Sequence, residues 1–163
     1  MKVKMEAIPK TEGIKYALPQ VNFTDTFSTT NHLDSLKTVS KLVFGTMPKW
    51  VEVLMKLRNN IVKVFGLKTE KPEDFHPDFK VGSYVGFFQI FSIQQNEIML
   101  GADDKHLNFR VSVYNSNENL FNIKVTTLVE YNNRFGKIYM FIVKPFHHLI
   151  VKRMVKQAYK SGL

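Results

Sequence analysis

The strongest constraint on the fold is a long stretch from Val81 to Tyr131 that shows a period of two, with apolar and polar residues alternating in its last two strands and apolar residues on both faces of its first. A period of two is typical of strands, whose successive side chains point to opposite faces of a sheet. The run predicts four strands, with the bounds Val81 to Ile93, Glu97 to Ala102, Leu107 to Tyr114 and Leu120 to Tyr131. The segments between them are short and rich in turn-forming residues, which favours hairpins between consecutive strands and an antiparallel sheet.

The segments before and after this run show other patterns. Val21 to Thr29 is predicted to be a strand with a bulge near Thr24 and Asp25, and residues 1–19 are predicted to be an irregular lead-in. Apolar residues at helical spacing predict three helices: Asp34 to Phe44, Lys49 to Phe65, and a final helix that runs to about Lys160 and is kinked at Pro145. The apolar stripe of the final helix is traced by Ile138, Ile142, Phe146, Leu149, Ile150 and Val155.

A single domain over residues 1–163 is expected, because 44% hydrophobic residues in a chain of this length suffice for one core. The element order predicts the α+β class: a curved antiparallel sheet packed on a long C-terminal helix, with two helices after strand one. This order is that of the helix-grip fold, which has START-like and polyketide-cyclase-like members and often has room for a hydrophobic cavity. Fourteen Phe and six Tyr must fill the core or line such a cavity.

Three short stretches carry a narrower resemblance. They are Val81 to Phe88 (VGSYVGFF), Leu100 to Phe109 (LGADDKHLNF) and Lys144 to Leu149 (KPFHHL). Together they are similar to the family catalogued as domain of unknown function 2867, and the resemblance extends over roughly residues 20 to 160. Ser83 stands where the family pattern often has an acid, so no role is transferred to that position. The resemblance implies a fold and no settled activity.

The sequence lacks the usual signals of export and membrane insertion. The chain has no Cys, which excludes disulfides and thiolate ligands and fits a reducing compartment. The N-terminus has no apolar core of a secretory signal. The longest weakly charged apolar stretch, Ile138 to Val143, is far shorter than the roughly 20 residues that cross a bilayer. We therefore expect a cytoplasmic protein.

Motifs for cofactors and metals are also missing. The sequence contains no nucleophile elbow, no Gly-rich phosphate loop and no His pair at metal-ligand spacing, so neither a cofactor nor a metal is expected. The net charge of +9 raises nucleic acid, an anionic membrane surface or an acidic ligand as partners. Because the lysines are spread along the chain without an Arg-rich tract, no nucleic-acid partner is predicted.

The densest polar group is Asp103, Asp104, His106 and Arg110, at a strand end. Carboxylate and imidazole groups could perform acid–base chemistry or hold a divalent metal. However, the two neighbouring Asp side chains point to opposite faces of a strand, which favours a hairpin-turn role over a ligand-anchoring or catalytic one.

Two further groups of residues on the final helix leave alternatives open. His147 and His148 lie about 100° apart around the axis, so we expect at most one to face the sheet. An inward His147 could meet Tyr131, Tyr139 or His32 as a polar anchor, although a surface or core role is favoured. A lysine stripe recurs at every fourth position, and either solvent or an anionic membrane could balance its charge. Its members are Lys144, His148, Lys152, Lys156 and Lys160.

The favoured function is binding of a small hydrophobic or lipid-like molecule in a cavity between the sheet and the last helix. The candidate ligand-binding residues are Phe87, Phe91, Phe109, Arg110, Tyr131, Tyr139, Phe146 and His147. One alternative is an enzyme of cyclase or hydrolase type, with polar candidates His32, Asp103, Asp104, His106 and also His147. A non-catalytic role is preferred to this enzymatic alternative. The other alternative is peripheral association with an anionic membrane through the basic final helix.

Overall fold

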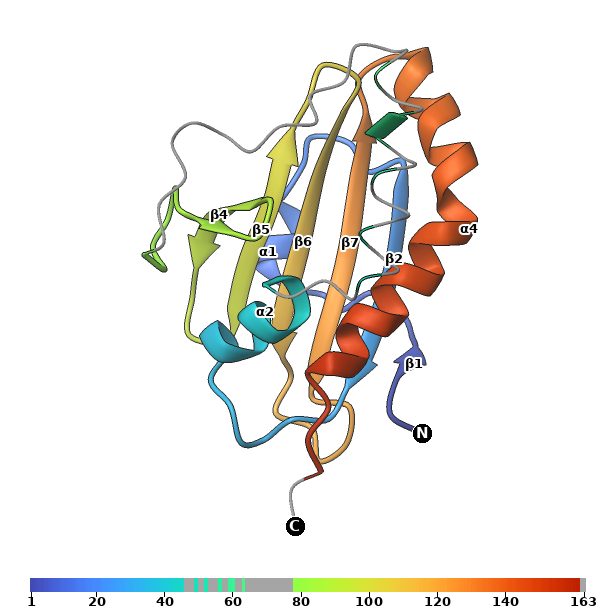
Figure 1. Cartoon of the computed structure of the whole chain (residues 1–163). Coiled ribbons are helices and arrows are strands. Elements are labelled where there is room, and N and C mark those ends of the chain that lie inside the picture. The colour runs from blue at the N-terminus through green and yellow to red at the C-terminus, as the bar shows by residue number, and fades with distance from the viewer. Residues whose placement is uncertain are drawn as a thin grey trace.

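The computed structural model describes residues 1–45 and 78–161, together with six helical residues between them, which are Lys49, Glu52, Lys56, Asn59, Asn60 and Lys63. Its centre is a seven-stranded, entirely antiparallel, curled sheet with the order β1-β2-β7-β6-β5-β4-β3 (Figure 1). The α+β class is therefore confirmed. The other positions of the helix predicted over Lys49 to Phe65 lie outside the described residues.

The elements follow the predicted order with some changes at their ends. The strands are β1 (Lys4–Met5), β2 (Phe23–Thr29), β3 (Tyr84–Val85), β4 (Phe88–Ile93), β5 (Glu97–Asp103), β6 (Leu107–Asn115) and β7 (Ile123–Tyr131). The helices are α1 (Glu12–Lys15), α2 (Leu36–Phe44) and α4 (Arg134–Gln157). The lead-in predicted to be irregular thus contains β1 and α1.

The two faces of the sheet are covered by different parts of the chain. In Figure 1, α2 and α4 lie in front of the sheet and α1 lies behind it. The alternation along β5 shows the division, since Ile98 and Leu100 join the core under α2 and α4, whereas Met99 packs against Ile14 and Leu18 of the lead-in. We call the face under α2 and α4 the inner face, and the face covered by the lead-in the outer face. Both faces of the central strands are therefore buried, each by a different layer.

Two details of the predicted strands are wrong. The strand predicted over Val81 to Ile93 is divided into β3 and β4 at Gly86, whose φ of +62° is a turn conformation. A Cβ at Gly86 would lie 2.6 Å from the carbonyl oxygen of Phe44. The bulge predicted near Thr24 and Asp25 is absent, because β2 pairs with β7 without interruption; the register shift lies in β4 instead.

Helix α4 turns a different face to the sheet from the one that its apolar stripe predicts. It is capped by Asn133, whose side-chain oxygen accepts from the main-chain N–H groups of Phe135 and Gly136, and it continues through Pro145 to Gln157. Its buried residues are Gly136, Met140, Met154 and Val155. Ile138, Ile142, Phe146 and Leu149 of the predicted stripe are exposed.

The close packing of Gly136 explains this rotation. A Cβ at Gly136 would overlap the main-chain carbonyl oxygen of His106, so the helix can approach β6 only with this glycine toward the sheet. At about 100° per residue, Met140 and Met154 then fall on the same side as Gly136. The exposed stripe residues fall roughly 200° to 280° away, on the opposite side.

Candidate functional site

The most unusual polar group on the inner face is the carboxylate of Asp25 in β2. Because side chains alternate along a strand, Asp25 shares a face with Phe23 and Phe27, and that face is turned toward α4. Its side chain is only 1% exposed. A buried carboxylate requires hydrogen bonds or opposite charge to offset its loss of hydration.

Two neighbouring histidines on α4 supply that environment. Nε2 of His147 lies 3.1 Å from Oδ2 of Asp25 and 3.3 Å from Oδ1, and Nε2 of His148 also lies 3.1 Å from Oδ2. The expectation that at most one of the two histidines faces the sheet is wrong. Asp25 lies under the helix between the two positions, so that both imidazole rings reach the same oxygen.

The hydrogen bonding of this carboxylate is incomplete. The contact of His147 with Oδ1 has hydrogen-bond geometry. Oδ2 is buried and, among the described residues, has no partner with such geometry, although two imidazole nitrogens lie 3.1 Å away. Buried carboxylate oxygens are normally hydrogen-bonded, and an exception often marks a functional site or an additional bound group.

Aromatic rings surround the charged groups. The Phe23 ring meets His147 edge-on at 5.6 Å between centroids and stacks on His148 at 6.2 Å. Phe27 contacts His148 edge-on at 6.0 Å, and Nζ of Lys144 lies 5.5 Å from the Phe23 ring centroid. We define the Asp25 site as these six residues: Phe23, Asp25, Phe27, Lys144, His147 and His148.

The Asp25 site is open to solvent from one side. The side chain of His148 is 37% exposed and that of His147 is 17% exposed. The site lies near the edge of the sheet, where the short β1 pairs only with Phe27 and Ser28 of β2. The imidazole rings, unlike the carboxylate, are therefore partly accessible to solvent.

The ring nitrogens define what this site can bind. A carboxylate only accepts hydrogen bonds, so an imidazole that bonds to Asp25 does so through Nε2–H. Its Nδ1 is then an acceptor when the ring is neutral and a donor when it is protonated. Within the described part of the chain, neither His147 nor His148 makes a further hydrogen bond through Nδ1. The Nδ1 atoms of both rings are thus available for hydrogen bonds to a ligand, and the His147 ring is held through Nε2 by the buried carboxylate.

Four of the predicted ligand-binding residues belong to this region of the inner face. His147 is part of the Asp25 site, and a cluster around Leu107, Val129 and Met140 adjoins the site through Phe23. Phe109, Tyr131 and Tyr139 pack against that cluster. Burial raises the pKa of the Tyr131 hydroxyl.

The other four predicted residues lie elsewhere, so the eight do not line one cavity. Phe87 is exposed in the turn between β3 and β4, and Phe146 is exposed on the outward side of α4. Phe91 and Arg110 are on the outer face, where the guanidinium carbon lies 3.7 Å from the centroid of the Phe91 ring. The division follows from strand alternation, since Phe109 and Arg110 are neighbours in β6 and point to opposite faces.

The polar candidates from the sequence do not converge either. Asp103 forms an ion pair with Arg110 at 2.7 Å, and the main-chain N–H of Asp104 closes the β5–β6 turn. Nδ1 of His106 lies within 3.1 Å of the side-chain amide of Asn133, the N-cap of α4. His32 is exposed and contacts the carbonyl oxygen of Asn119 at 3.0 Å. Each of these contacts supports a turn or a helix end.

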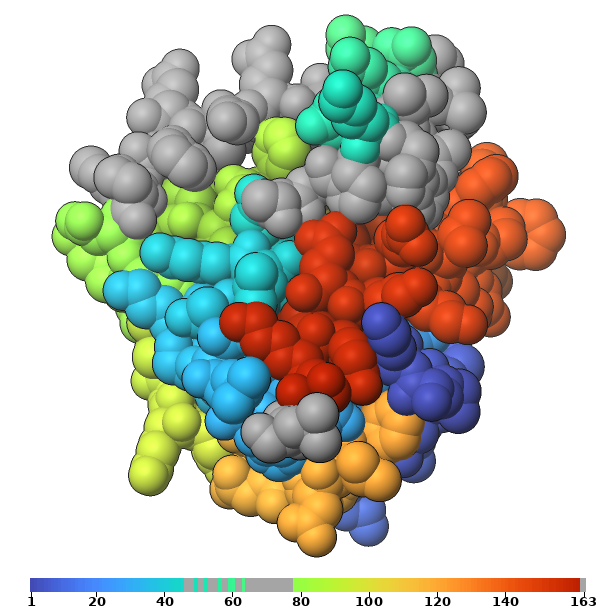
Figure 2. Space-filling view, turned by 60° about the horizontal axis from the view of Figure 1, so that its bottom comes forward, coloured from blue at the N-terminus to red at the C-terminus, as the bar shows by residue number. Residues whose placement is uncertain are grey.

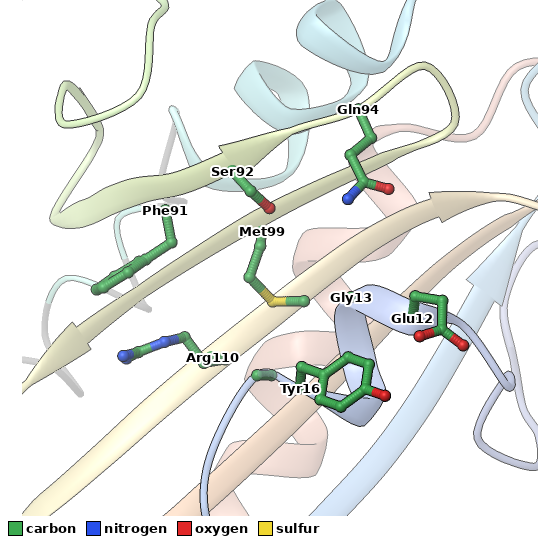
Figure 3. A pocket seen from close by; sticks show the side chains of 9 residues that line it. Glu12, Gly13, Tyr16, Phe91, Ser92, Gln94, Met99 and Arg110 are labelled. Carbon is green, nitrogen blue, oxygen red and sulfur yellow. The ribbon is translucent and has the colours of Figure 1, made fainter.

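The outer face has an open pocket of about 380 Å³ between α1 and strands β4 to β6 (Figure 3). It is lined by Glu12, Gly13, Tyr16, Ala17, Phe91, Ser92, Gln94, Met99 and Arg110. Its polar lining residues include Glu12, Gln94 and Arg110, and the Arg110 guanidinium already pairs with Asp103 and stacks on Phe91.

Sequence reasoning missed Asp25 and His148. Asp25 alternates with Phe23 and Phe27, and an acid in such a pattern is predicted to point into the core. Because a bulge was predicted at this position, the direction of the Asp25 side chain was not inferred.

The described residues contain no group of three or more His, Asp or Glu side chains arranged to hold a metal ion.

Comparisons with known proteins give one result. A family model described as "Protein of unknown function (DUF2867)" matches residues 17–154, a span that contains Asp25, His147 and His148. No curated protein and no solved structure matches the chain. The helix-grip assignment therefore stays a prediction from topology.

Proposed function

The chain belongs to the DUF2867 family of proteins of unknown function, and from the geometry of the Asp25 site we propose that it binds a small amphipathic molecule between β2 and α4. The observation that carries this proposal is the buried Oδ2 of Asp25, which has two imidazole nitrogens at 3.1 Å and no well-formed hydrogen bond. A purely structural carboxylate is usually fully hydrogen-bonded by its neighbours, so we take Asp25 to position the two imidazoles for a ligand rather than to contact the ligand itself.

The chemistry of the site favours a ligand with an apolar body and an anionic head. The rings of Phe23 and Phe27, and the aromatic cluster next to them, offer an apolar surface. A protonated imidazole carries a hydrogen on both ring nitrogens, so a ring that contacts Asp25 through Nε2 can donate from Nδ1–H to an anion. The ammonium group of Lys144 lies beside Phe23 and adds positive charge at the same place.

Titration with decanoate, a ten-carbon carboxylate, tests the proposal. We expect saturable changes in the imidazole ¹⁵N resonances of His147 and His148, largest at Nδ1. Asp25→Asn should weaken binding about tenfold or more, since a hydrogen bond to a charged group contributes about 1.5–3 kcal/mol.

The matched control is His32→Gln, which removes an exposed histidine that contacts only a loop carbonyl. This variant should bind decanoate as the unmodified protein does. The proposal is wrong if decanoate leaves both α4 imidazoles unchanged, or if the two variants bind it equally well.

A second candidate is acid–base catalysis at the same site. His147 is held through Nε2 by a buried carboxylate, the arrangement by which a carboxylate orients a histidine base in hydrolases. A general base typically contributes about 10²-fold or more to a rate. If the chain hydrolyses p-nitrophenyl decanoate, His147→Gln and Asp25→Asn should each lower kcat/KM about 100-fold, with His32→Gln as the control. Binding without turnover would exclude this candidate and leave the first intact.

A further inference from the structure

The outward side of α4 carries a ridge of large apolar side chains. They are Phe135, Ile138, Phe141, Ile142, Phe146 and Leu149, all exposed, with Phe141 the most exposed at 84%. Their spacing of three or four residues places them on neighbouring turns, opposite the face that Gly136 turns to the sheet. An apolar patch of this kind on a folded domain marks an interaction surface. We call these six residues the α4 ridge.

Basic side chains extend and border the ridge. The 24 residues of α4 include Arg134, Lys137, Lys144, Lys152, Arg153 and Lys156, and no Asp or Glu. Lys152, Arg153 and Lys156 continue the outward side beyond Leu149. None of these six cations forms an ion pair within the described ranges.

The lysine stripe predicted from the sequence is only partly free. Lys160 forms an ion pair with Asp34 at 2.8 Å, His148 contacts Asp25, and Lys144 lies over the Phe23 ring. The members of the stripe without such a contact among the described residues are Lys152 and Lys156, towards the end of α4, and Figure 2 shows this end (red) at the surface beside the N-terminal residues (dark blue). The free positive charge therefore lies in line with the α4 ridge.

We propose that the α4 ridge docks on the surface of an anionic lipid bilayer, with the helix axis parallel to the membrane plane. A helix with large apolar residues on one side and lysines around them is typical of such interfacial binding. The ring and aliphatic side chains enter the headgroup boundary, and Lys152, Arg153 and Lys156 meet the lipid phosphates. None of the described helices is long and apolar enough to span the bilayer.

The positive charge of α4 favours an anionic membrane, rather than a second copy of the chain, as the partner of the α4 ridge. Two such helices packed against each other would bring together twelve cations, six from each copy, without an acidic residue from α4 to balance them. The ridge residues are exposed on the outward side of a single helix and therefore form a convex surface. A fluid bilayer adapts to a convex apolar surface, whereas a protein partner must supply a matching groove. This proposal is independent of ligand binding at the Asp25 site.

Vesicle co-sedimentation tests the docking surface. We expect the full chain to pellet with vesicles of phosphatidylcholine and phosphatidylglycerol at about 7:3, and about tenfold less with phosphatidylcholine alone. Raising the salt from about 0.1 M to about 0.5 M should weaken the interaction, because the Debye length shortens.

Two double variants and two matched controls locate the binding surface. Phe141→Ser with Ile138→Ser removes apolar groups of the ridge, and Lys152→Glu with Lys156→Glu reverses two free charges; each should lower the bound fraction at least about fivefold. The controls are Leu33→Ser with Leu120→Ser and Lys10→Glu with Lys80→Glu, which change exposed residues outside α4. Circular dichroism verifies that every variant is folded.

The outcomes distinguish a membrane from a second copy of the chain as the partner of the α4 ridge. Equal pelleting by the ridge variants and their controls, equal pelleting with neutral vesicles, or no pelleting at all would overturn the proposal. Sedimentation velocity that shows a dimer lost in the Phe141→Ser, Ile138→Ser variant would assign the ridge to a second copy instead. Asp25→Asn should pellet normally, which keeps this result separate from ligand binding.

Discussion

Gly136 packs against the main-chain carbonyl of His106 so closely that no side chain fits between the helix and the strand. The side chain of His106 contacts Asn133, the N-cap of the same helix. These two contacts fix where α4 begins and which side of it faces the sheet. They thereby place His147 and His148 over Asp25 and turn the α4 ridge outward.

Gly136→Ala should lower the free energy of unfolding by about 1–3 kcal/mol, because the added methyl group overlaps main-chain atoms that cannot move freely. Helix propensity alone predicts the opposite sign, since Ala favours a helix over Gly by about 1 kcal/mol. Urea unfolding measures the difference. Lys137→Ala, at the exposed neighbouring position, is the control and should change stability by less than about 0.5 kcal/mol. A stabilised Gly136→Ala protein would contradict the packing described here.

Asp25→Asn should change the free energy of unfolding by no more than about 1 kcal/mol. The Oδ2 atom that it replaces has no well-formed hydrogen bond, and the amide keeps an oxygen for His147. Thermal unfolding of the two proteins measures this. A loss of about 3 kcal/mol or more would mean that Asp25 serves the fold rather than a ligand.

Glu97→Ala should lower the free energy of unfolding more than Asp25→Asn does, although Glu97 is also a buried acid on a strand. Its Oε1 accepts hydrogen bonds from the hydroxyls of Thr11 and Ser112, which connect the α1 segment to the outer face. Removing the carboxylate leaves both hydroxyls without this partner, and we expect a loss of about 2–4 kcal/mol. Chemical denaturation of the two proteins measures this loss of stability. Stability unchanged by Glu97→Ala would indicate that the α1 segment does not depend on this anchor.

The ion pair between Asp34 and Lys160 should make stability depend on pH in the acidic range. Hydrogen bonds from Lys160 and then Asn31 lower the pKa of the Asp34 carboxyl in the folded state. The stabilisation is therefore fully present above the unfolded pKa of about 3.9 and is lost as the pH falls through the lower folded value. Melting temperatures measured from neutral pH down to about pH 2 should fall more steeply for the unmodified protein than for Asp34→Asn. Parallel curves would contradict the assignment.

Local patterns in the sequence were sufficient for most of the elements. The alternation that predicts β5, β6 and β7 depends only on neighbouring residues, and their bounds differ from the prediction by a few residues. The helix predicted over Asp34 to Phe44 is capped by Ser35 and begins at Leu36. The division of Val81 to Ile93 was missed because this segment is apolar on both faces, so the turn at Gly86 interrupts no alternating pattern.

Local sequence patterns predict less well which face of a helix is buried. The apolar stripe of α4 predicts that Ile138 and Phe146 pack on the sheet, yet both are exposed. The rule that apolar residues face the core fails here because the rotation of the helix depends on a main-chain contact of Gly136, and no apolar period reports it. Phe109 and Tyr131 were correctly expected on the face that α4 covers, since alternation along a strand is a local property.

The sequence by itself thus determined the α+β class, the order of strands and helices, and the family, because each of these depends on patterns among neighbouring residues. Only the tertiary structure decided the site. Asp25 and His147 are separated by 122 positions, and they meet because β2 pairs with β7 while Gly136 sets the rotation of the helix that follows β7. A contact of this kind is the product of several long-range packing choices, and no single segment of the chain contains it.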